Sequence, residues 1–386
     1  MDFKASADWT FPVPIFYGPQ RIKDVSTLCK SHGITRPLVV TDKGSAELDL
    51  VKNFMKQLNS ASLKCDLFSG ISPNPIGHEI YDGKAVYNAG KHDGVIAIGG
   101  GSGMDGGKAI SLIANNDDDL WKFDYNFEAN KSLTIFPPLI CIPTTAGTGA
   151  ETESTAMVTN SELGMKFCLW HPNQKPLAAI LDPSLTIGLP RNLTAWTGVD
   201  ALVHAIEAYS VNDLHSPADG VALEALSLIG ENLKVVYKKP DNLTSRGAML
   251  VGSCLAGIAF LKGLGLVHAI SHMVGAEYDT QHGLTNAVIL PSVLKFNENY
   301  ISNKINRMHF SQYSKPGDFV GFYSATCNLL DELEIPKTLK EIGVGDDRFH
   351  ELAVKARKDS AAFTNPRDAS IEEIEHLIGE VYSVGR

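Results

Sequence analysis

The chain has 386 residues and a formal net charge of −10 at neutral pH. Because one hydrophobic core usually serves at most roughly 250–300 residues, we expect two domains. The negative charge, together with the absence of any Lys/Arg cluster, disfavours nucleic acid and anionic membrane surfaces as partners.

Six scattered cysteines without a C-x-x-C pair indicate reduced thiols in a cytoplasmic protein rather than a disulfide framework. The N-terminal residues show no basic region followed by an apolar core, so we expect no secretory signal. The longest uncharged apolar stretch, residues 247–261, is shorter than the roughly 18–20 residues that span a bilayer and suits a buried helix instead.

The first half of the chain alternates short apolar runs with amphipathic stretches, which predicts βαβ units and a parallel sheet. We expect strands at residues 37–42, 64–69, 94–99 and 139–143. We expect helices at residues 48–58, 78–89 and 103–114.

Beyond Pro190 the pattern becomes helical, with no convincing strand. We expect helices at residues 194–210, 217–237, 244–259 and 267–278. The sequence therefore predicts an α/β domain over residues 1–190 and an all-helical domain over residues 191–386.

A glycine-rich segment, Gly99-Gly-Gly-Ser-Gly-Met-Asp-Gly-Gly-Lys108, follows a predicted strand and opens a predicted helix. In that position its backbone N–H groups and the helix N-terminus could bind a diphosphate, although a simple tight turn is the alternative. Gly101, Gly103 and Gly106 also satisfy G-x-G-x-x-G. We do not assign the Rossmann fingerprint, because that motif follows the first strand of its domain and this segment follows the third predicted strand.

Two further polar positions follow predicted strands of the same sheet. Asp42 could accept hydrogen bonds from an adenosine ribose, or it could equally cap a turn. The hydroxyls of Pro143-Thr-Thr-Ala-Gly-Thr-Gly-Ala-Glu151 suit a diphosphate or a nicotinamide ribose, or simply end a Thr-rich strand. Two such loops on one sheet, the glycine-rich and the threonine-rich one, favour a cofactor cleft.

A carboxylate and several histidines recur at helical spacing in the second half. Asp200 and His204 are four residues apart, as are His268 and His272, and each pair would share one helix face. His282 follows closely. Imidazoles and a carboxylate without a thiolate suit Fe2+, Zn2+, Ni2+, Co2+ or Mn2+, with a coordination position left open for catalysis.

These segments together resemble the iron-dependent (group III) alcohol dehydrogenases from about Tyr17 to Tyr382. The family patterns Gly-Gly-Gly-Ser-x-x-Asp-x-x-Lys and Pro-Thr-Thr-Ala-Gly-Thr-x-x-Glu match the two loops. The patterns Gly-Val-Asp-Ala-x-x-His-Ala-x-Glu and His-x-x-x-His…His-Gly match residues 198–207 and 268–283. The resemblance implies a dinucleotide-binding α/β domain, an all-helical domain and a metal in the cleft between them.

The same resemblance implies site residues. It assigns the metal ligands as Asp200, His204, His268 and His282, with Fe2+ favoured and Zn2+ as the alternative. It assigns His272 to the nicotinamide side and the proton path. It assigns the NAD(H) contacts to Asp42, Asn74, Gly99, Gly100, Gly101, Ser102, Asp105, Thr144, Thr145, Thr148 and Lys166.

The expected reaction is reversible hydride transfer between NAD(H) and a short primary alcohol or aldehyde, in a homo-oligomer (a dimer or larger). The chain departs from many members at Ala259-Phe-Leu-Lys-Gly-Leu-Gly265, which is one residue shorter and carries Lys262. Lys262 could face a distal anionic group of the substrate, or cap a helix C-terminus. A polyol-phosphate dehydrogenase or a dehydroquinate-synthase-like lyase is the alternative function; a metal-dependent hydrolase would leave both loops unexplained.

Overall fold

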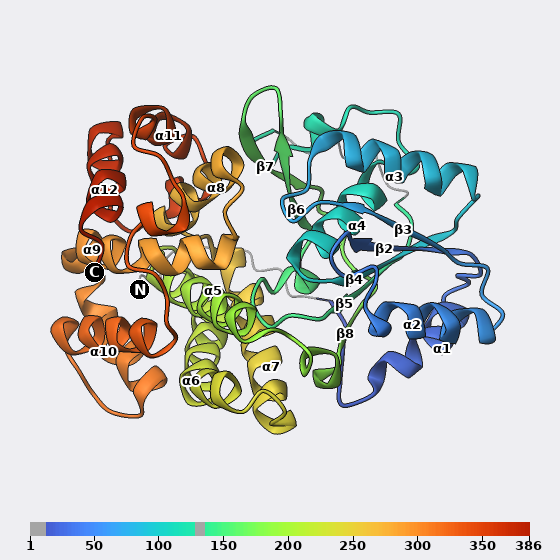
Figure 1. The fold of residues 1–386 in the computed structure, drawn as a ribbon, viewed down its shortest axis with the longest axis horizontal. Coiled ribbons are helices and arrows are strands. Elements are labelled where there is room, and N and C mark those ends of the chain that lie inside the picture. The colour runs from blue at the N-terminus through green and yellow to red at the C-terminus, as the bar shows by residue number, and fades with distance from the viewer. Residues whose placement is uncertain (1–12, 128–135) are drawn as a thin grey trace. The chain divides into compact units, whose positions relative to one another are not determined.

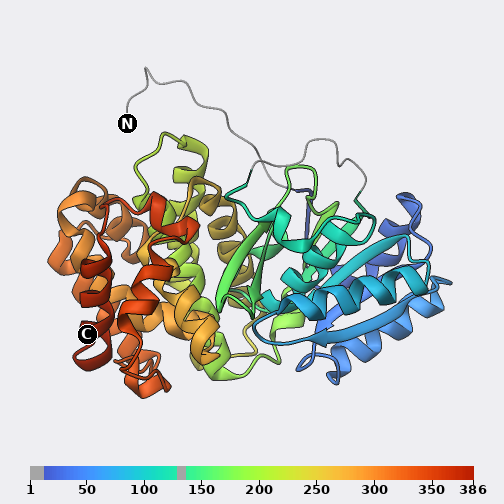
Figure 2. The same ribbon diagram turned by 90° about the horizontal axis from the view of Figure 1, so that it is seen from above.

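The computed structural model describes residues 13–127 and 136–386, which form two compact units (Figures 1 and 2). An α/β unit extends to Thr145 and resumes over Ala150–Gly188, and a helical unit comprises Ala146–Gly149 and Leu189–Arg386. The sequence prediction divided the chain after residue 190. The structure divides it after Gly188 and adds a four-residue loop to the helical unit.

Within the described residues of the α/β unit, six strands form one sheet in the order β1-β8-β5-β4-β2-β3, and every neighbouring pair is parallel. The strands are β1 (Ile15–Tyr17), β2 (Pro37–Asp42), β3 (Asp66–Ile71), β4 (Gly94–Gly99), β5 (Leu139–Pro143) and β8 (Ala178–Leu181). The helices α1 (Val25–Ser31), α2 (Asp49–Ser60), α3 (Gly77–Ala89) and α4 (Gly101–Ile113) connect them.

Alternate side chains of the central strands enter two separate cores because a strand points successive residues to opposite faces. Leu38 and Val40 of β2 join the core under α3 and α4. Val39, between them, joins the core with α1 and α2. Figure 1 shows the two helix pairs on opposite sides of the strands. Burial on both faces explains why these strands read as continuous apolar runs.

The carboxyl ends of β2 and β4 form the topological switch point of the sheet. These strands are neighbours, yet α2, which follows β2, and α4, which follows β4, cover opposite faces. The chain therefore leaves adjacent strand ends in opposite directions, and open α/β sheets bind ligands at such a point. Asp42 and Gly99 are the last residues of these two strands.

The sequence prediction missed four strands of the α/β unit. An antiparallel hairpin joins β6 (Thr155–Asn160) and β7 (Met165–Trp170). The edge strand β1 has three residues, and β8 has only four, Ala-Ala-Ile-Leu. Alanine is depleted in strands, so pairing with β5 and β1, rather than local propensity, determines the conformation of β8.

In the helical unit, the described residues form helices without a strand. They are α5 (Arg191–Ser210), α6 (Ser216–Lys238), α7 (Leu243–Ala259), α8 (Leu266–Tyr278), α9 (His282–Tyr313), α10 (Phe319–Glu332), α11 (Phe349–Ala356) and α12 (Ile371–Ser383). The first four agree with the predicted helices to within a turn at each end. The predicted fold class, a parallel-sheet α/β domain followed by an all-helical domain, is confirmed.

Helix α5 lies in the interior of the helical unit, and a lysine side chain caps its C-terminus. The Lys304 ammonium donates to the carbonyls of Tyr209, Ser210 and Val211 at 3.0, 2.9 and 2.6 Å. These carbonyls lack partners within the helix, and a cation also suits the negative end of the helix dipole. The cap therefore fixes the end of the helix that carries Asp200 and His204.

One segment of the described chain, Leu243–Lys262, is long and apolar enough to cross a membrane by length and composition alone. It comprises α7 and the short 3-10 helix Phe260–Lys262. Of its most apolar window, 67% is buried inside the protein, as in the core helix of a globular domain.

Candidate metal centre and nucleotide-binding loops

Three helices of the helical unit bring four metal-ligand side chains together. Asp200 and His204 lie one turn apart on α5, His268 lies on α8, and His282 begins α9. One ligand atom from each side chain lies within 4.8 Å of those of the other three. One carboxylate oxygen and three imidazole nitrogens in this spacing suit a borderline divalent cation.

Burial prepares the imidazoles of this centre for ligation. Desolvation lowers the pKa of His204 to about 4 and that of His268 to about 3, so both rings are neutral at pH 7. A metal binds the neutral ring, so no proton has to be removed first. The side chain of His282 is 24% exposed whereas those of His268 and Asp200 are at most 2% exposed, so the centre opens toward solvent on the His282 side.

A buried carboxylate orients His268. Glu207, also on α5, accepts from His268 Nδ1 at 2.6 Å and from the Val267 N–H at 2.8 Å. Because Nδ1 carries the proton, Nε2 presents its lone pair. Burial raises the pKa of Glu207 to about 7, and a cation held by the neighbouring ring would favour the charged carboxylate. This is the carboxylate–histidine arrangement that supports metal ligands in other proteins.

His272 lies beside the ligand cluster and has its own carboxylate. Its ring stacks on that of His282 at a centroid distance of 5.4 Å, and its Nδ1 lies 2.9 Å from Asp359 Oδ2. Asp359 also accepts the backbone N–H of Ala361 at 2.8 Å. The carboxylate thus fixes the ring and leaves Nε2 as the nitrogen that can exchange a proton.

Lys262 forms a buried ion pair that the sequence did not reveal. Its ammonium lies 2.6 Å from Asp219 Oδ1, and its side chain is only 2% exposed. A buried carboxylate therefore already balances the charge that was expected to attract an anionic substrate. The ion pair joins the 3-10 helix after α7 to α6, so the side chain is neither a free cation nor a simple helix cap.

The glycine-rich loop of the α/β unit is shaped for close approach of a ligand to its backbone. Gly99 has φ +144°, and a Cβ atom there would lie 3.0 Å from Asp42 Oδ2. At Gly103, a Cβ atom would lie 3.1 Å from the carbonyl oxygen of Ile98. Helix α4 then begins without a side-chain cap on its N-terminus. Its first N–H groups are therefore available to an anion.

Asp42 lies beside this loop and also holds a turn. Its carboxylate accepts from the Ser45 N–H at 2.9 Å and the Ser45 hydroxyl at 2.7 Å. The carboxylate therefore stabilises a turn, as one of the two interpretations expects. It also lies at the switch point next to Gly99, a position compatible with the other interpretation, a contact to the adenosine ribose.

The threonine loop adjoins the glycine loop. The Thr144 N–H donates to the Gly99 carbonyl at 2.8 Å, and a Cβ atom at Gly100 would lie 3.5 Å from Thr145 Cγ2. Thr148 lies in the Ala146–Gly149 segment, which packs with the helical unit.

Asn74 and Lys166 meet in the α/β unit although 92 residues separate them in sequence. The Lys166 ammonium, on β7, donates to Asn74 Oδ1 at 2.9 Å. Glu79 holds the Asn74 turn, accepting from the N–H groups of Ser72 at 3.0 Å and Ile76 at 3.3 Å. The hairpin that the sequence prediction missed therefore places Lys166 at the turn after β3.

Asp105 belongs to a buried charge cluster under α4. It lies 3.4 Å from the Lys108 ammonium, which also donates to Glu153 Oε1 and to the Ala150 carbonyl, both at 2.7 Å. Burial raises the pKa of Asp105 to about 6. The Asp105 carboxylate thus helps to balance the buried Lys108 ammonium. Lys108 in turn ties α4 to the segment after the threonine loop, so the two side chains support the helix that follows the glycine loop.

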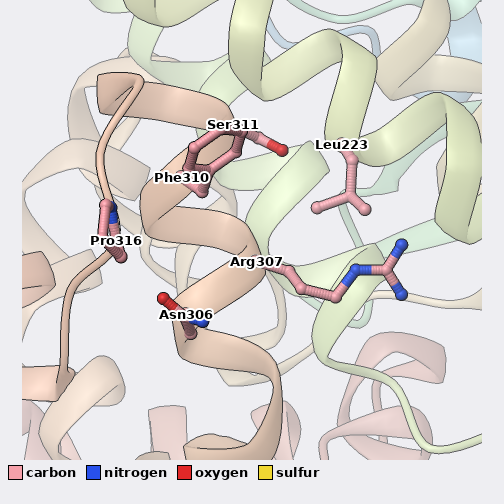
Figure 3. A pocket seen from close by; sticks show the side chains of 6 residues that line it. All are labelled: Leu223, Asn306, Arg307, Phe310, Ser311 and Pro316. Carbon is pink, nitrogen blue, oxygen red and sulfur yellow. The ribbon is translucent and has the colours of Figure 1, made fainter.

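A surface pocket of about 300 Å³ lies elsewhere on the helical unit (Figure 3). Its lining residues are Leu223, Asn306, Arg307, Phe310, Ser311 and Pro316. None of these is a metal-ligand candidate or one of the residues that support them. We therefore separate this pocket from the candidate metal centre.

Comparisons with known proteins define the class. Residues 12–183 match iron-containing alcohol dehydrogenases, and residues 194–382 match the C-terminal domain of the Fe-containing alcohol dehydrogenase family. The chain belongs to the iron-containing alcohol dehydrogenase family. The resemblance stated from the sequence motifs is thereby confirmed, and the chain is an enzyme of the iron-type alcohol dehydrogenase class.

Individual relatives match over nearly the whole chain. A 1,3-propanediol dehydrogenase of Klebsiella pneumoniae is 34% identical over 97% of this chain and 98% of its own length. An NAD-dependent methanol dehydrogenase of Bacillus methanolicus is 34% identical over 94% of this chain and 96% of its own. The crystal structure of a 1,3-propanediol oxidoreductase superposes with a TM-score of 0.92 at 34% identity, covering 98% of this chain and 100% of the other. The lyase and polyol-phosphate alternatives are not favoured by these matches.

Sequence reasoning assigned no role to three side chains that contact the candidate ligands or His272. Glu207 was visible as the last residue of the Gly198–Glu207 motif, three residues after His204. Asn286 is four residues after His282, a spacing that places both side chains on one helix face and could have indicated their contact. Asp359 had no such spacing signal, because 87 residues separate it from His272.

Proposed function

We propose that this protein catalyses the reversible oxidation of a short primary alcohol to its aldehyde with NAD+, using Fe2+ held by Asp200, His204, His268 and His282. The observation that carries the proposal is the cluster of four ligand atoms within 4.8 Å of one another. When bound, the cation supplies Lewis acidity and the nicotinamide accepts the hydride. The names of the relatives, a propanediol and a methanol dehydrogenase, support a short substrate.

The residues of the α/β unit would hold the cofactor. The first N–H groups of α4, at Gly101 and Ser102, and the glycine backbone that precedes them, at Gly99 and Gly100, suit the diphosphate. Asp42, at the end of β2, suits the adenosine ribose hydroxyls and disfavours a 2′-phosphate by charge repulsion. The remaining contacts are proposed for Asn74, Thr144, Thr145 and Lys166 of this unit and for Thr148 of the loop that packs with the helical unit. Asp105 would contribute by stabilising α4.

The proton released by alcohol oxidation needs a carrier, and we assign this task to His272. Its pairing with Asp359 and its stacking on His282 support the assignment. Glu207 would keep His268 in the tautomer that offers Nε2. Lys262 is not proposed as a substrate contact, because Asp219 already balances its charge.

The test uses full-length protein purified without oxygen. Elemental analysis should find about one iron per chain, and NADH absorbance should fall when short aldehydes such as propanal are added. His282→Ala should lose both metal and turnover with an unchanged circular dichroism spectrum. Full activity in a metal-free protein would refute the proposal, and activity that survives prolonged chelator and peroxide treatment would indicate Zn2+ instead.

We also propose a cytoplasmic location, which six scattered cysteines without a C-x-x-C pair support. Assembly as a dimer or larger homo-oligomer stays a prediction, and light scattering of the purified protein measures it.

A further inference from the structure

The side-chain amide of Asn286 lies among the candidate ligand atoms. Asn286 is on α9, one turn after His282, and is completely buried. Its Nδ2 lies 2.7 Å from Asp200 Oδ1, 3.1 Å from His282 Nε2 and 3.2 Å from His268 Nε2. One nitrogen therefore contacts three of the four side chains proposed to bind the metal.

The chemistry of the neighbours fixes the orientation of the amide. Asp200 Oδ1 is an acceptor, and His268 Nε2 is an acceptor because its Nδ1 donates to Glu207. Turning the amide over would place its oxygen against these acceptors, so the nitrogen must face them. Among the described residues, Asn286 Oδ1 has no hydrogen-bond partner although it is buried. Facing the ligands thus leaves a buried carbonyl unsatisfied, which is normally unfavourable.

The three contacts differ in what a cation would do to them. An imidazole Nε2 has one lone pair, so a metal must displace the amide from both histidines. A carboxylate oxygen can accept more than one partner. The contact to Asp200 is also the shortest, and hydrogen bonds to a charged acceptor are the stronger ones. Only the bond from Asn286 to Asp200 is therefore compatible with a loaded site.

We propose that Asn286 is a positioning residue for the metal centre. In the metal-free protein its amide nitrogen keeps Asp200 Oδ1, His268 Nε2 and His282 Nε2 directed toward one point. In the loaded protein it continues to orient the Asp200 carboxylate. This inference rests on the proposed metal site and adds to it a side chain that controls affinity and geometry without being a ligand.

The experiment measures metal binding in the metal-free, full-length protein. Zn2+ affinity is obtained by competition with a chromophoric chelator, and Co2+ is added separately because its visible spectrum reports the geometry of its ligands. Asn286→Leu keeps the approximate volume and removes the donor. We expect its Zn2+ affinity to fall about 10–100-fold, the usual effect of losing a residue that supports metal ligands, with an altered Co2+ spectrum.

Thr285→Val is the matched control. Thr285 is the preceding residue, equally buried, and its hydroxyl bonds Thr280 Oγ1 at 2.8 Å and the Gln281 carbonyl at 3.0 Å. This variant also loses buried hydrogen bonds on α9, so it measures how much the loss of such bonds alone affects metal binding. We expect its Zn2+ affinity and Co2+ spectrum to equal those of wild type.

Asn286→Asp tests the donor in a side chain of the same shape. It places an acceptor against Asp200, so the metal-free variant should melt at a lower temperature than wild type, and Zn2+ should raise its melting temperature by more. An Asn286→Leu protein with unchanged or tighter Zn2+ binding, or a metal-free Asn286→Asp protein that melts like wild type, would overturn the inference. Failure of wild type itself to bind metal would overturn the proposed function instead.

Discussion

Replacing Glu207 by glutamine should weaken metal binding by reversing the tautomer of His268. Glutamine has the same shape, and its oxygen can still accept the Val267 N–H, which donates to Glu207 at 2.8 Å in the structure. Its NH2 group then faces His268 Nδ1 at the present 2.6 Å contact, where two donors cannot coexist. The ring responds by moving its proton to Nε2, the nitrogen that the metal needs.

The size of the effect follows from the bond that is lost. A hydrogen bond to a charged group contributes about 1.5–3 kcal/mol, and each 1.4 kcal/mol changes an equilibrium constant tenfold. Zn2+ affinity should therefore fall by about 10–150-fold, measured by chelator competition on metal-free protein with circular dichroism as the check on folding. The control is Asp219→Asn, which alters another buried carboxylate of the same unit, the partner of Lys262, and should leave Zn2+ affinity unchanged. Equal affinity in wild type and Glu207→Gln would refute the tautomer argument.

Further predictions concern the cofactor, the proton path and stability. Asp42→Asn keeps an oxygen for the Ser45 N–H but removes the charge, so preference should shift toward NADP(H) by about 1–3 kcal/mol in relative kcat/KM; a wild type that already prefers NADP(H) would contradict this. Asp359→Asn should lower turnover about 10–100-fold at unchanged metal content, and loss of metal instead would show a purely structural role. Lys304→Met leaves the carbonyls at the end of α5 without their donor, so the free energy of unfolding in urea should fall by about 1–3 kcal/mol, whereas an unchanged value would mean that water replaces the ammonium.

The features that the sequence predicted are those encoded locally. Strands β2 and β4 are continuous apolar runs buried on both faces, and the ligand pairs follow helical spacing, so each could be recognised within one segment. Strand β8 could not, because its conformation depends on pairing with β5, about 40 residues earlier in the chain. The ion pair of Lys262 could not be predicted for the same reason: its partner Asp219 is 43 residues away, so the charge looked free in the sequence.

The Ala146–Gly149 loop means that the helical unit is not one continuous segment of the chain. Its neighbours Thr145 and Ala150 belong to the α/β unit, but the loop itself packs with the helical unit. A Cβ atom at Gly147 would lie 2.6 Å from Thr197 on α5, and one at Gly149 would lie 2.6 Å from Gly257 on α7. A helical fragment cut from the chain at residue 189 would therefore lack a tightly fitted piece of its own interior. Chimeras that exchange the helical half between relatives should therefore exchange this loop as well. Otherwise the loop of one relative would pack poorly against α5 of the other, the helix that bears two of the proposed metal ligands.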